Sequence, residues 1–149
     1  RLLILDEPTT GLDPQARHQI WESIISLKKS GTTVLLTTHY MDEATHLCDR
    51  LVIMDKGKII VTGSPKDLIR QYAGSHVIEI SPAGEAIESY LKQKALAFEK
   101  TPTHFFVYTQ KGPEVFSDIS LKFGEGGCAL RMANLEDVFL KLTGRELRE

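Results

Sequence analysis

Two short apolar runs, LLILD at residues 2–6 and TVLLTT at residues 33–38, constrain the fold of this chain more than any other feature. Each run has the pattern of a strand that is buried on both faces of a parallel sheet. The segment between them predicts a helix, because Asp13 is a good N-cap, Pro14 suits the first helical position and Gly31 supplies a stop. This alternation of strand and helix predicts an α/β unit with a parallel sheet.

The chain continues with shorter elements up to residue 73. A helix is expected over residues 41–48 and a strand over 51–54, and the turn at 55–58 then leads into a hairpin strand, IIVTG. Ser64 and Pro65 predict the start of a short helix that runs through Tyr72. The following Ala-Gly-Ser has the composition of a linker, so we place a domain boundary there, with one unit at 1–73 and a second at 74–149.

The second unit predicts a small α+β domain. Its expected order is strand, helix, strand, strand, helix, strand and a terminal helix, at residues 76–80, 84–96, 97–101, 104–109, 113–123, 128–132 and 135–143. The β-α-β-β-α-β order is that of a ferredoxin-like domain.

Composition excludes several classes of protein. The 149 residues are 42% hydrophobic and 26% charged, close to the average of globular domains. No apolar run approaches the roughly 18 residues that a membrane span needs, so we expect no transmembrane segment. With 18 basic and 20 acidic residues and a net charge of −2, the chain lacks the basic surface of a nucleic-acid-binding protein.

Asp6 and Glu7 are the first candidate functional residues. They follow an apolar strand, and ligands bind at the carboxyl ends of strands in α/β sheets. One carboxylate there can hold Mg²⁺, directly or through water, while its neighbour orients or deprotonates a water molecule. Taken alone, the pair fits an exposed strand end equally well.

The wider motif is far more specific. The string LDEPTTGLDP at residues 5–14 resembles the Walker B motif and D-loop of ATP-binding cassette (ABC) ATPases. His39 follows the second apolar run, where that family has its switch histidine, and the residues after it, YMDEA, also resemble the family. The resemblance implies the fold: the C-terminal part of a P-loop NTPase nucleotide-binding domain, followed here by the small accessory domain.

The same resemblance implies roles for four residues and two cofactors, ATP and Mg²⁺. Asp6 corresponds to the aspartate that positions Mg²⁺, and Glu7 to the glutamate that polarises the attacking water. His39 corresponds to the histidine that contacts the γ-phosphate. Asp13 belongs to the D-loop, which lies at the interface between two ATPase subunits, although it also reads as a helix N-cap.

The C-terminal end indicates the subfamily. The string NLEDVFLKLTGRE at residues 134–146 resembles the end of bacterial exporter ATPases of the drug-resistance and nodulation-factor type. Its physical pattern is a capped amphipathic helix with an apolar stripe of Leu135, Val138, Phe139 and Leu142. We expect the stripe to dock on another part of the protein.

The resemblance also implies what surrounds this chain. The Walker A phosphate-binding loop, the glutamine loop and the signature motif do not occur in the sequence, and in the family all three precede Walker B. We therefore read the chain as a C-terminal fragment that lacks the strand between residues 33–38 and 51–54, and we expect it to be inactive and to bind ATP negligibly. The implied partners are a membrane permease and a second ATPase subunit, with no nucleic acid, at the cytoplasmic face of the bacterial inner membrane. The alternatives are a soluble ABC ATPase outside transport, or a regulatory or dimerisation module in residues 75–149.

Overall fold

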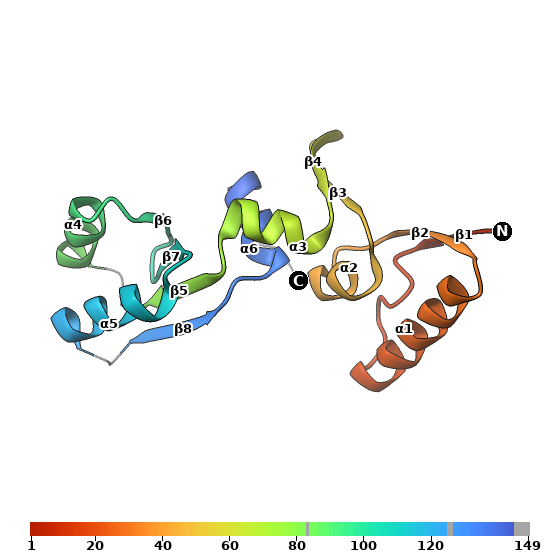
Figure 1. Ribbon diagram of the computed structural model, residues 1–149, viewed down its shortest axis with the longest axis horizontal. Helices are drawn as coiled ribbons and strands as arrows, with labels where there is room; N and C mark the ends of the chain where they lie inside the picture. Colours follow the sequence, from red (N-terminus) through yellow and green to blue (C-terminus); the bar gives the residue numbers. More distant parts are fainter. Residues whose placement is uncertain (83, 125–126, 145–149) are drawn as a thin grey trace.

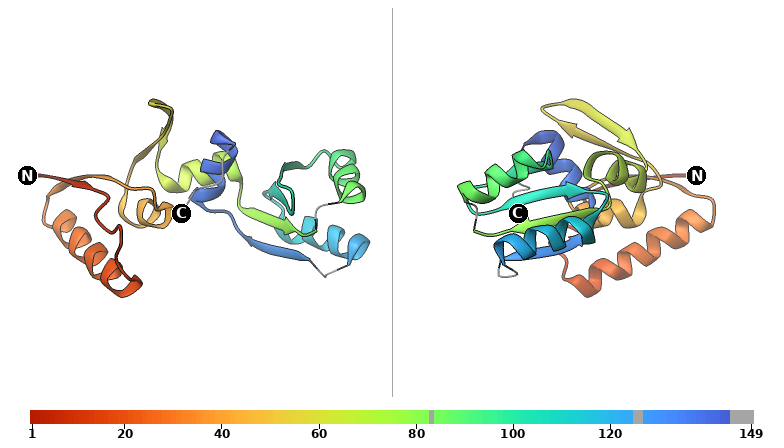
Figure 2. Two further views of the ribbon diagram at one scale, coloured as in Figure 1. Left: turned by 180° about the vertical axis from the view of Figure 1, so that it is seen from behind. Right: turned by 60° about the vertical axis from the view of Figure 1, so that its left-hand side comes forward.

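The computed structural model describes residues 1–82, 84–124 and 127–144. The molecule is elongated, with the first half of the chain at one end and a four-stranded sheet at the other (Figure 1). Helix α6, near the C-terminus of the described residues, lies in the middle beside α3 (Figures 1 and 2).

The first two strands form a parallel pair, as predicted. Strand β1 (Leu2–Asp6) pairs with β2 (Thr33–Thr37). Helix α1 (Pro14–Lys29) connects them and packs on one face of the pair, where Trp21 and Ile24 are buried. The Asp13 carboxylate caps this helix by accepting hydrogen bonds from the backbone N–H groups of its first turn.

Burial on both faces, which the apolar runs predicted for these strands, is wrong for this chain. Leu2, Ile4 and Leu35 are 64%, 66% and 58% exposed, because among the described residues no element packs on their face. An apolar run shows that both faces of a strand can be buried, but in the described residues only the face of the β1–β2 pair that packs on α1 is covered.

The hairpin that follows forms a separate sheet. Strands β3 (Leu51–Asp55) and β4 (Lys58–Gly63) are antiparallel, and neither pairs with β1 or β2. The strand that the sequence analysis expects between β2 and β3 stays a prediction. Helix α2 (Met41–Leu47) precedes the hairpin, and α3 (Pro65–Leu68) with the π-helical turn η1 (Ile69–Ala73) follows it.

The second half forms the predicted ferredoxin-like sheet. Its strand order is β6-β7-β5-β8 and every neighbouring pair is antiparallel. Helix α4 joins β5 to β6, and α5 joins β7 to β8 (Figure 1). The elements are β5 (His76–Ile80), α4 (Glu85–Gln93), β6 (Ala97–Lys100), β7 (Phe105–Thr109), α5 (Gly112–Phe123), β8 (Cys128–Met132) and α6 (Leu135–Thr143).

The two faces of this sheet belong to two different cores. Ile78, Phe105 and Val107 point toward α4 and α5 and are fully buried there. Val77 and Tyr108, which are paired across β5 and β7, point the other way. The alternation along β5 therefore lets one sheet carry two cores.

The second core crosses the predicted domain boundary. Leu135 and Val138 of α6 are buried together with residues of the first half, among them Ala44, Ile53 and Leu68. The segment at residues 73–75 is accordingly not an open linker, since Ala73 is 1% exposed within this core. The division at residue 74 stays a prediction for the units, but the packing of the two units is continuous.

Arg131 on β8 holds the start of α6 against the sheet. Its guanidinium donates two hydrogen bonds of 2.7 Å to the Asp137 carboxylate and one of 2.6 Å to Glu79. Asp137 also closes a capping box with Asn134. These contacts raise the pKa of Arg131, with the hydrogen bonds to Asp137 as the main cause.

No helix within the described residues has the length and apolar character to cross a bilayer.

Candidate active site

The predicted site residues meet at one edge of the β1–β2 pair. Asp6 ends β1, and Glu7 follows it directly. His39 lies two residues beyond the end of β2, in the link to α2, rather than at the last position of the strand. Because β1 and β2 are parallel, their carboxyl ends coincide, and this brings Asp6, Glu7 and His39 together.

Thr37, the last residue of β2, connects the two acids. It lies directly opposite Asp6 in the strand register, and its hydroxyl donates a hydrogen bond to Oδ1 of Asp6. The same hydroxyl oxygen accepts a hydrogen bond of 3.2 Å from the backbone N–H of Glu7. That N–H also donates to the carbonyl oxygen of Thr37 at 3.0 Å.

Glu7 has an unusual backbone conformation. Its φ of 45° lies in the left-handed region, which costs a non-glycine residue about 1–3 kcal/mol and occurs most often at functional sites. The bonds to Thr37 hold its N–H, and its carbonyl oxygen accepts from the N–H of Thr10 at 3.2 Å. The Thr10 hydroxyl donates to Oε2 of Glu7 at 3.1 Å, so the side chain is oriented as well.

His39 lies against Glu7. Its Nδ1 is 3.3 Å from Oε1 of Glu7, and both side chains are about half exposed, at 44% and 48%. The imidazole also packs on the ring of Tyr40, with 4.1 Å between ring centroids. The guanidinium of Arg17, from α1, lies over that ring at 4.6 Å. Arg17, Tyr40 and His39 thus form a row of contacting side chains that runs from α1 to Glu7.

Asp13 is used differently from the other three residues. Its Oδ1 accepts from the N–H groups of Gln15 and Ala16 at 2.9 and 3.0 Å, which confirms the N-cap interpretation. Within the described part of the chain it makes no hydrogen bond or ion pair with Asp6, Glu7 or His39. Its role in the D-loop at a subunit interface stays a prediction.

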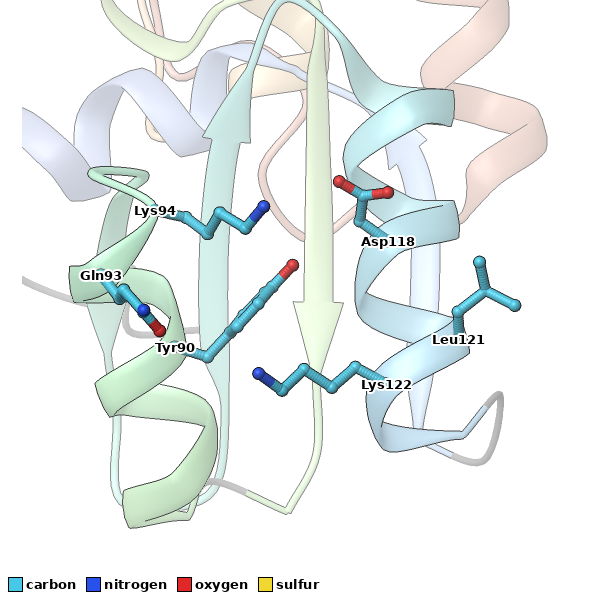
Figure 3. Close-up of a pocket in the computed structure, with 6 residues that line it drawn as sticks. All are labelled: Tyr90, Gln93, Lys94, Asp118, Leu121 and Lys122. Atoms are coloured by element: carbon cyan, nitrogen blue, oxygen red, sulfur yellow. The ribbon is translucent and has the colours of Figure 1, made fainter.

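The site is open to solvent rather than enclosed. Two concavities lie elsewhere: a groove of about 700 Å³ between α4 and α5, and one of about 290 Å³ between α1 and α2. The larger groove is lined by Tyr90, whose ring lies between the side chains of Lys94 and Lys122, with Asp118 across from Lys94 (Figure 3). None of the predicted site residues lines either groove.

Two carboxylates and an imidazole at the ends of two parallel strands are groups that a metal-dependent hydrolysis can use. Oδ1 of Asp6 is bonded by Thr37, and its second oxygen has no hydrogen-bond partner among residues 1–82, 84–124 and 127–144. A free carboxylate oxygen suits Mg²⁺, which is usually held by one or two carboxylates, waters and substrate phosphates rather than by an all-protein cage. The described residues hold no cluster of three or more metal-binding side chains.

Reasoning from the sequence missed Thr37, Thr10 and the Arg17–Tyr40 stack. Thr37 could have been found, because aligning the ends of two parallel strands places it opposite Asp6. Thr10 and Arg17 carry no such signal, since their contacts depend on the turn after β1 and on the rotation of α1.

Comparison with protein families gives two matches. Residues 84–144 match the C-terminal domain of the nodulation factor export protein NodI. Residues 1–41 match an AAA domain family described as a putative AbiEii toxin of a type IV toxin–antitoxin system.

Curated relatives cover nearly the whole chain. The Nod factor export ATP-binding protein I of Cupriavidus metallidurans is 46% identical over 154 residues, covering 99% of this chain and 49% of that protein. The protein of the same name from Mesorhizobium japonicum is 44% identical over 153 residues, covering 100% of this chain and 44% of its own length. The chain thus spans about half the length of the curated relatives it matches.

Two solved structures show partial similarity. One is cbiO1 from Clostridium perfringens, described as part of the ABC transporter complex cbiONQ, with a TM-score of 0.42 and 38% identity over 45% of this chain and 27% of that chain. The other is described as an ATP-binding subunit of an ABC transporter, with a TM-score of 0.44 and 32% identity over 62% of this chain and 36% of that chain.

Proposed function

We propose that this chain, which is homologous over nearly all of its length to the Nod factor export ATP-binding proteins, is the C-terminal part of the ATP-binding and ATP-hydrolysing subunit of a bacterial ABC exporter. In the complete subunit, ATP hydrolysis powers transport through a separate membrane permease. The observation that carries the proposal is the meeting of Asp6, Glu7 and His39 at one edge of β1 and β2, with Glu7 and His39 in direct contact.

The three residues divide the chemistry among them. Asp6 would hold Mg²⁺, through water, with the oxygen that Thr37 leaves free. Mg²⁺ supplies charge neutralisation of the transferred phosphoryl group. Glu7 accepts a hydrogen bond from the attacking water and draws off its proton, while His39 contacts the γ-phosphate and keeps Glu7 in place through their 3.3 Å contact.

The remaining parts of the assembly follow from the proposal. The half-exposed side chains of Glu7 and His39 are accessible to a nucleotide held by the rest of the subunit and by a second copy, which Asp13 would face. We place the subunit at the cytoplasmic face of the inner membrane, bound peripherally to its permease and not to nucleic acid. The chain alone, without a phosphate cradle, is expected to be inactive.

The test is a substitution in the complete subunit. Glu7→Gln removes the base but keeps the shape of the side chain, so we expect ATP binding to persist while hydrolysis slows by about 10² to 10⁴-fold. Steady-state phosphate release and equilibrium binding of ATP measure the two effects. Glu22→Gln, an exposed glutamate on α1, is the matched control and should leave both unchanged.

A loss of hydrolysis smaller than threefold in Glu7→Gln would contradict the assignment of the base. Loss of ATP binding in the same variant would place Glu7 in the fold or in nucleotide binding instead.

A further inference from the structure

We infer that the Thr37 hydroxyl is a positioning group of the proposed hydrolysis site, which sets the carboxylate of Asp6 and the backbone of Glu7 relative to each other. The inference rests on the proposed function. Thr37 contacts neither the nucleotide nor the attacking water and acts only through the two acids.

The hydrogen bonds around Thr37 have a fixed direction. The N–H of Glu7 can only donate, so at the 3.2 Å contact the Thr37 oxygen is the acceptor. The hydroxyl proton is therefore directed to the other neighbour, Oδ1 of Asp6, which accepts as a carboxylate. One hydroxyl thus holds Oδ1 of Asp6 and favours one rotamer of its side chain.

Asp6 has no other support. It lies on the exposed face of the β1–β2 pair, and in the part of the chain that the structure describes only Thr37 hydrogen-bonds its side chain. Without that bond the carboxylate is free to change rotamer. The oxygen that we assign to the metal would then lose its fixed place.

Glu7 depends on the same residue. The left-handed backbone at Glu7, with φ of 45°, is held by the bifurcated hydrogen bond from its N–H to the hydroxyl and the carbonyl oxygen of Thr37. Removal of the hydroxyl leaves only the carbonyl half of that bond. The Thr37 hydroxyl oxygen therefore contacts both groups, and it couples the backbone direction at Glu7 to the position of the Asp6 carboxylate.

The experiment compares Thr37→Val with Thr37→Ser in the complete subunit. Valine keeps the shape and the β-branching of threonine but has no hydroxyl, whereas serine keeps the hydroxyl. Thr33→Val is the matched control, because Thr33 lies on the same face of β2 but opposite Leu2, at the far end of the strand. Thr37→Ala is a second test of hydroxyl loss if the valine variant does not fold.

Two measurements separate positioning from a structural role. The first is the steady-state rate of hydrolysis at saturating ATP. The second is the dissociation constant of a non-hydrolysable ATP analogue measured with Mg²⁺ and again with EDTA, which reports the Mg²⁺-dependent part of binding without any turnover.

We expect Thr37→Val to lower kcat by about 10 to 100-fold, the size of effect that misplacement of a reacting group by about 1 Å produces. The gain in affinity for the analogue on adding Mg²⁺ should be smaller in Thr37→Val than in wild type. The affinity in EDTA should stay within about twofold of wild type, because the site binds phosphates mainly through other groups. Thr37→Ser and Thr33→Val should behave as wild type in both measurements.

Wild-type hydrolysis and Mg²⁺ dependence in Thr37→Val would overturn the inference, as would equal losses in Thr37→Ser and Thr37→Val. A drop in melting temperature with unchanged kcat and Mg²⁺ dependence would give Thr37 a purely structural role and overturn it too. If Glu7→Gln is also without effect, the proposed function itself fails. If Glu7→Gln is inactive and Thr37→Val is not, only the positioning role fails.

Discussion

The ionisation equilibrium of Glu88 is strongly shifted toward the charged form. Its carboxylate accepts hydrogen bonds from Lys100 on β6 and from Lys92 on its own helix, α4. These bonds, that of Lys100 first, lower the pKa of Glu88 from its ordinary value near 4.5 to about 2. The side chain is four-fifths buried and connects α4 to the edge strand.

The shift predicts a pH dependence of stability. Because the folded pKa lies below the unfolded one, the contribution of Glu88 is complete above about pH 4.5 and is lost as the pH falls through about 2. We expect Glu88→Gln to remove this part of the acid sensitivity, so that its stability falls less steeply than that of wild type between these values. Urea denaturation of the chain across the range measures the slope.

Glu85→Gln, an exposed position in the first turn of the same helix, is the control for this experiment. Its stability should follow that of wild type over the whole range. A wild-type slope in Glu88→Gln would show that the two lysine contacts do not persist in solution.

Helix α6 is the element on which the arrangement of the two halves depends most. Leu135 is 1% exposed, in the core that includes Ala44, Ile53 and Leu68 of the first half. We expect Leu135→Ala to lower the free energy of unfolding by about 2–5 kcal/mol, the usual effect of removing a fully buried leucine side chain. Denaturant unfolding followed by circular dichroism gives the value.

The chain offers a matched leucine for comparison. Leu121 on α5 is 84% exposed, so Leu121→Ala should change the free energy of unfolding by no more than about 0.5 kcal/mol. Equal effects at the two positions would mean that α6 is not docked on the first half in solution.

At the level of elements, the sequence was most informative where local signals agree. Helix α1 begins as predicted, with Asp13 as its N-cap and Pro14 as its first residue. Helix α6 also has its predicted bounds, with Asn134 as the N-cap and Gly144 as the C-cap, because caps act within one turn. Burial was harder to predict, since an apolar pattern does not tell which partner covers it. For that reason the exposure of Leu2 and Ile4 differed from the expectation, and the partner of the α6 stripe was left open.

In the candidate site, too, some features could be predicted from the sequence and others could not. Asp6, Glu7 and His39 could be named from their motifs, and the parallel pairing of their strands explains why they converge. The contact between Glu7 and His39 and the hydrogen bonds of Thr37 depend on the left-handed turn at Glu7, which no local propensity favours in a glutamate.

Besides the core between α1 and the β1–β2 pair, the described residues form two cores that differ in where their residues come from. Among the described residues, the core beneath α4 and α5 is built only from those after position 74, including Ile78, Leu91 and Phe105. The core around α6 combines residues from both halves. The two units are therefore unequal in their dependence on each other.

This difference predicts how residues 74–149 behave as a separate polypeptide. Their sheet is complete without any strand of the first half, so we expect a cooperative thermal transition, at a lower temperature than that of the whole chain because the unit is small. Helix α6 keeps its bonds from Arg131 and its contacts with Val77 and Tyr108, but it loses the apolar partners from the first half and the hydrogen bond from Lys141 to the carbonyl of Tyr72. Its backbone amides should therefore exchange more than about tenfold faster than in the whole chain, which requires a loss of only about 1.4 kcal/mol in opening free energy.

Circular dichroism melting and hydrogen exchange by NMR test both expectations on the same sample. Amides of β5 and β7, which lie at the centre of the sheet, serve as the internal control and should stay protected in the isolated unit. A melt without cooperativity would mean that the core beneath α4 and α5 needs the first half after all, and the boundary at residue 74 would be wrong. Unchanged protection of α6 beside a cooperative melt would lead to a different conclusion: the Arg131–Asp137 pair, rather than the core shared with the first half, would then be what holds this helix in place.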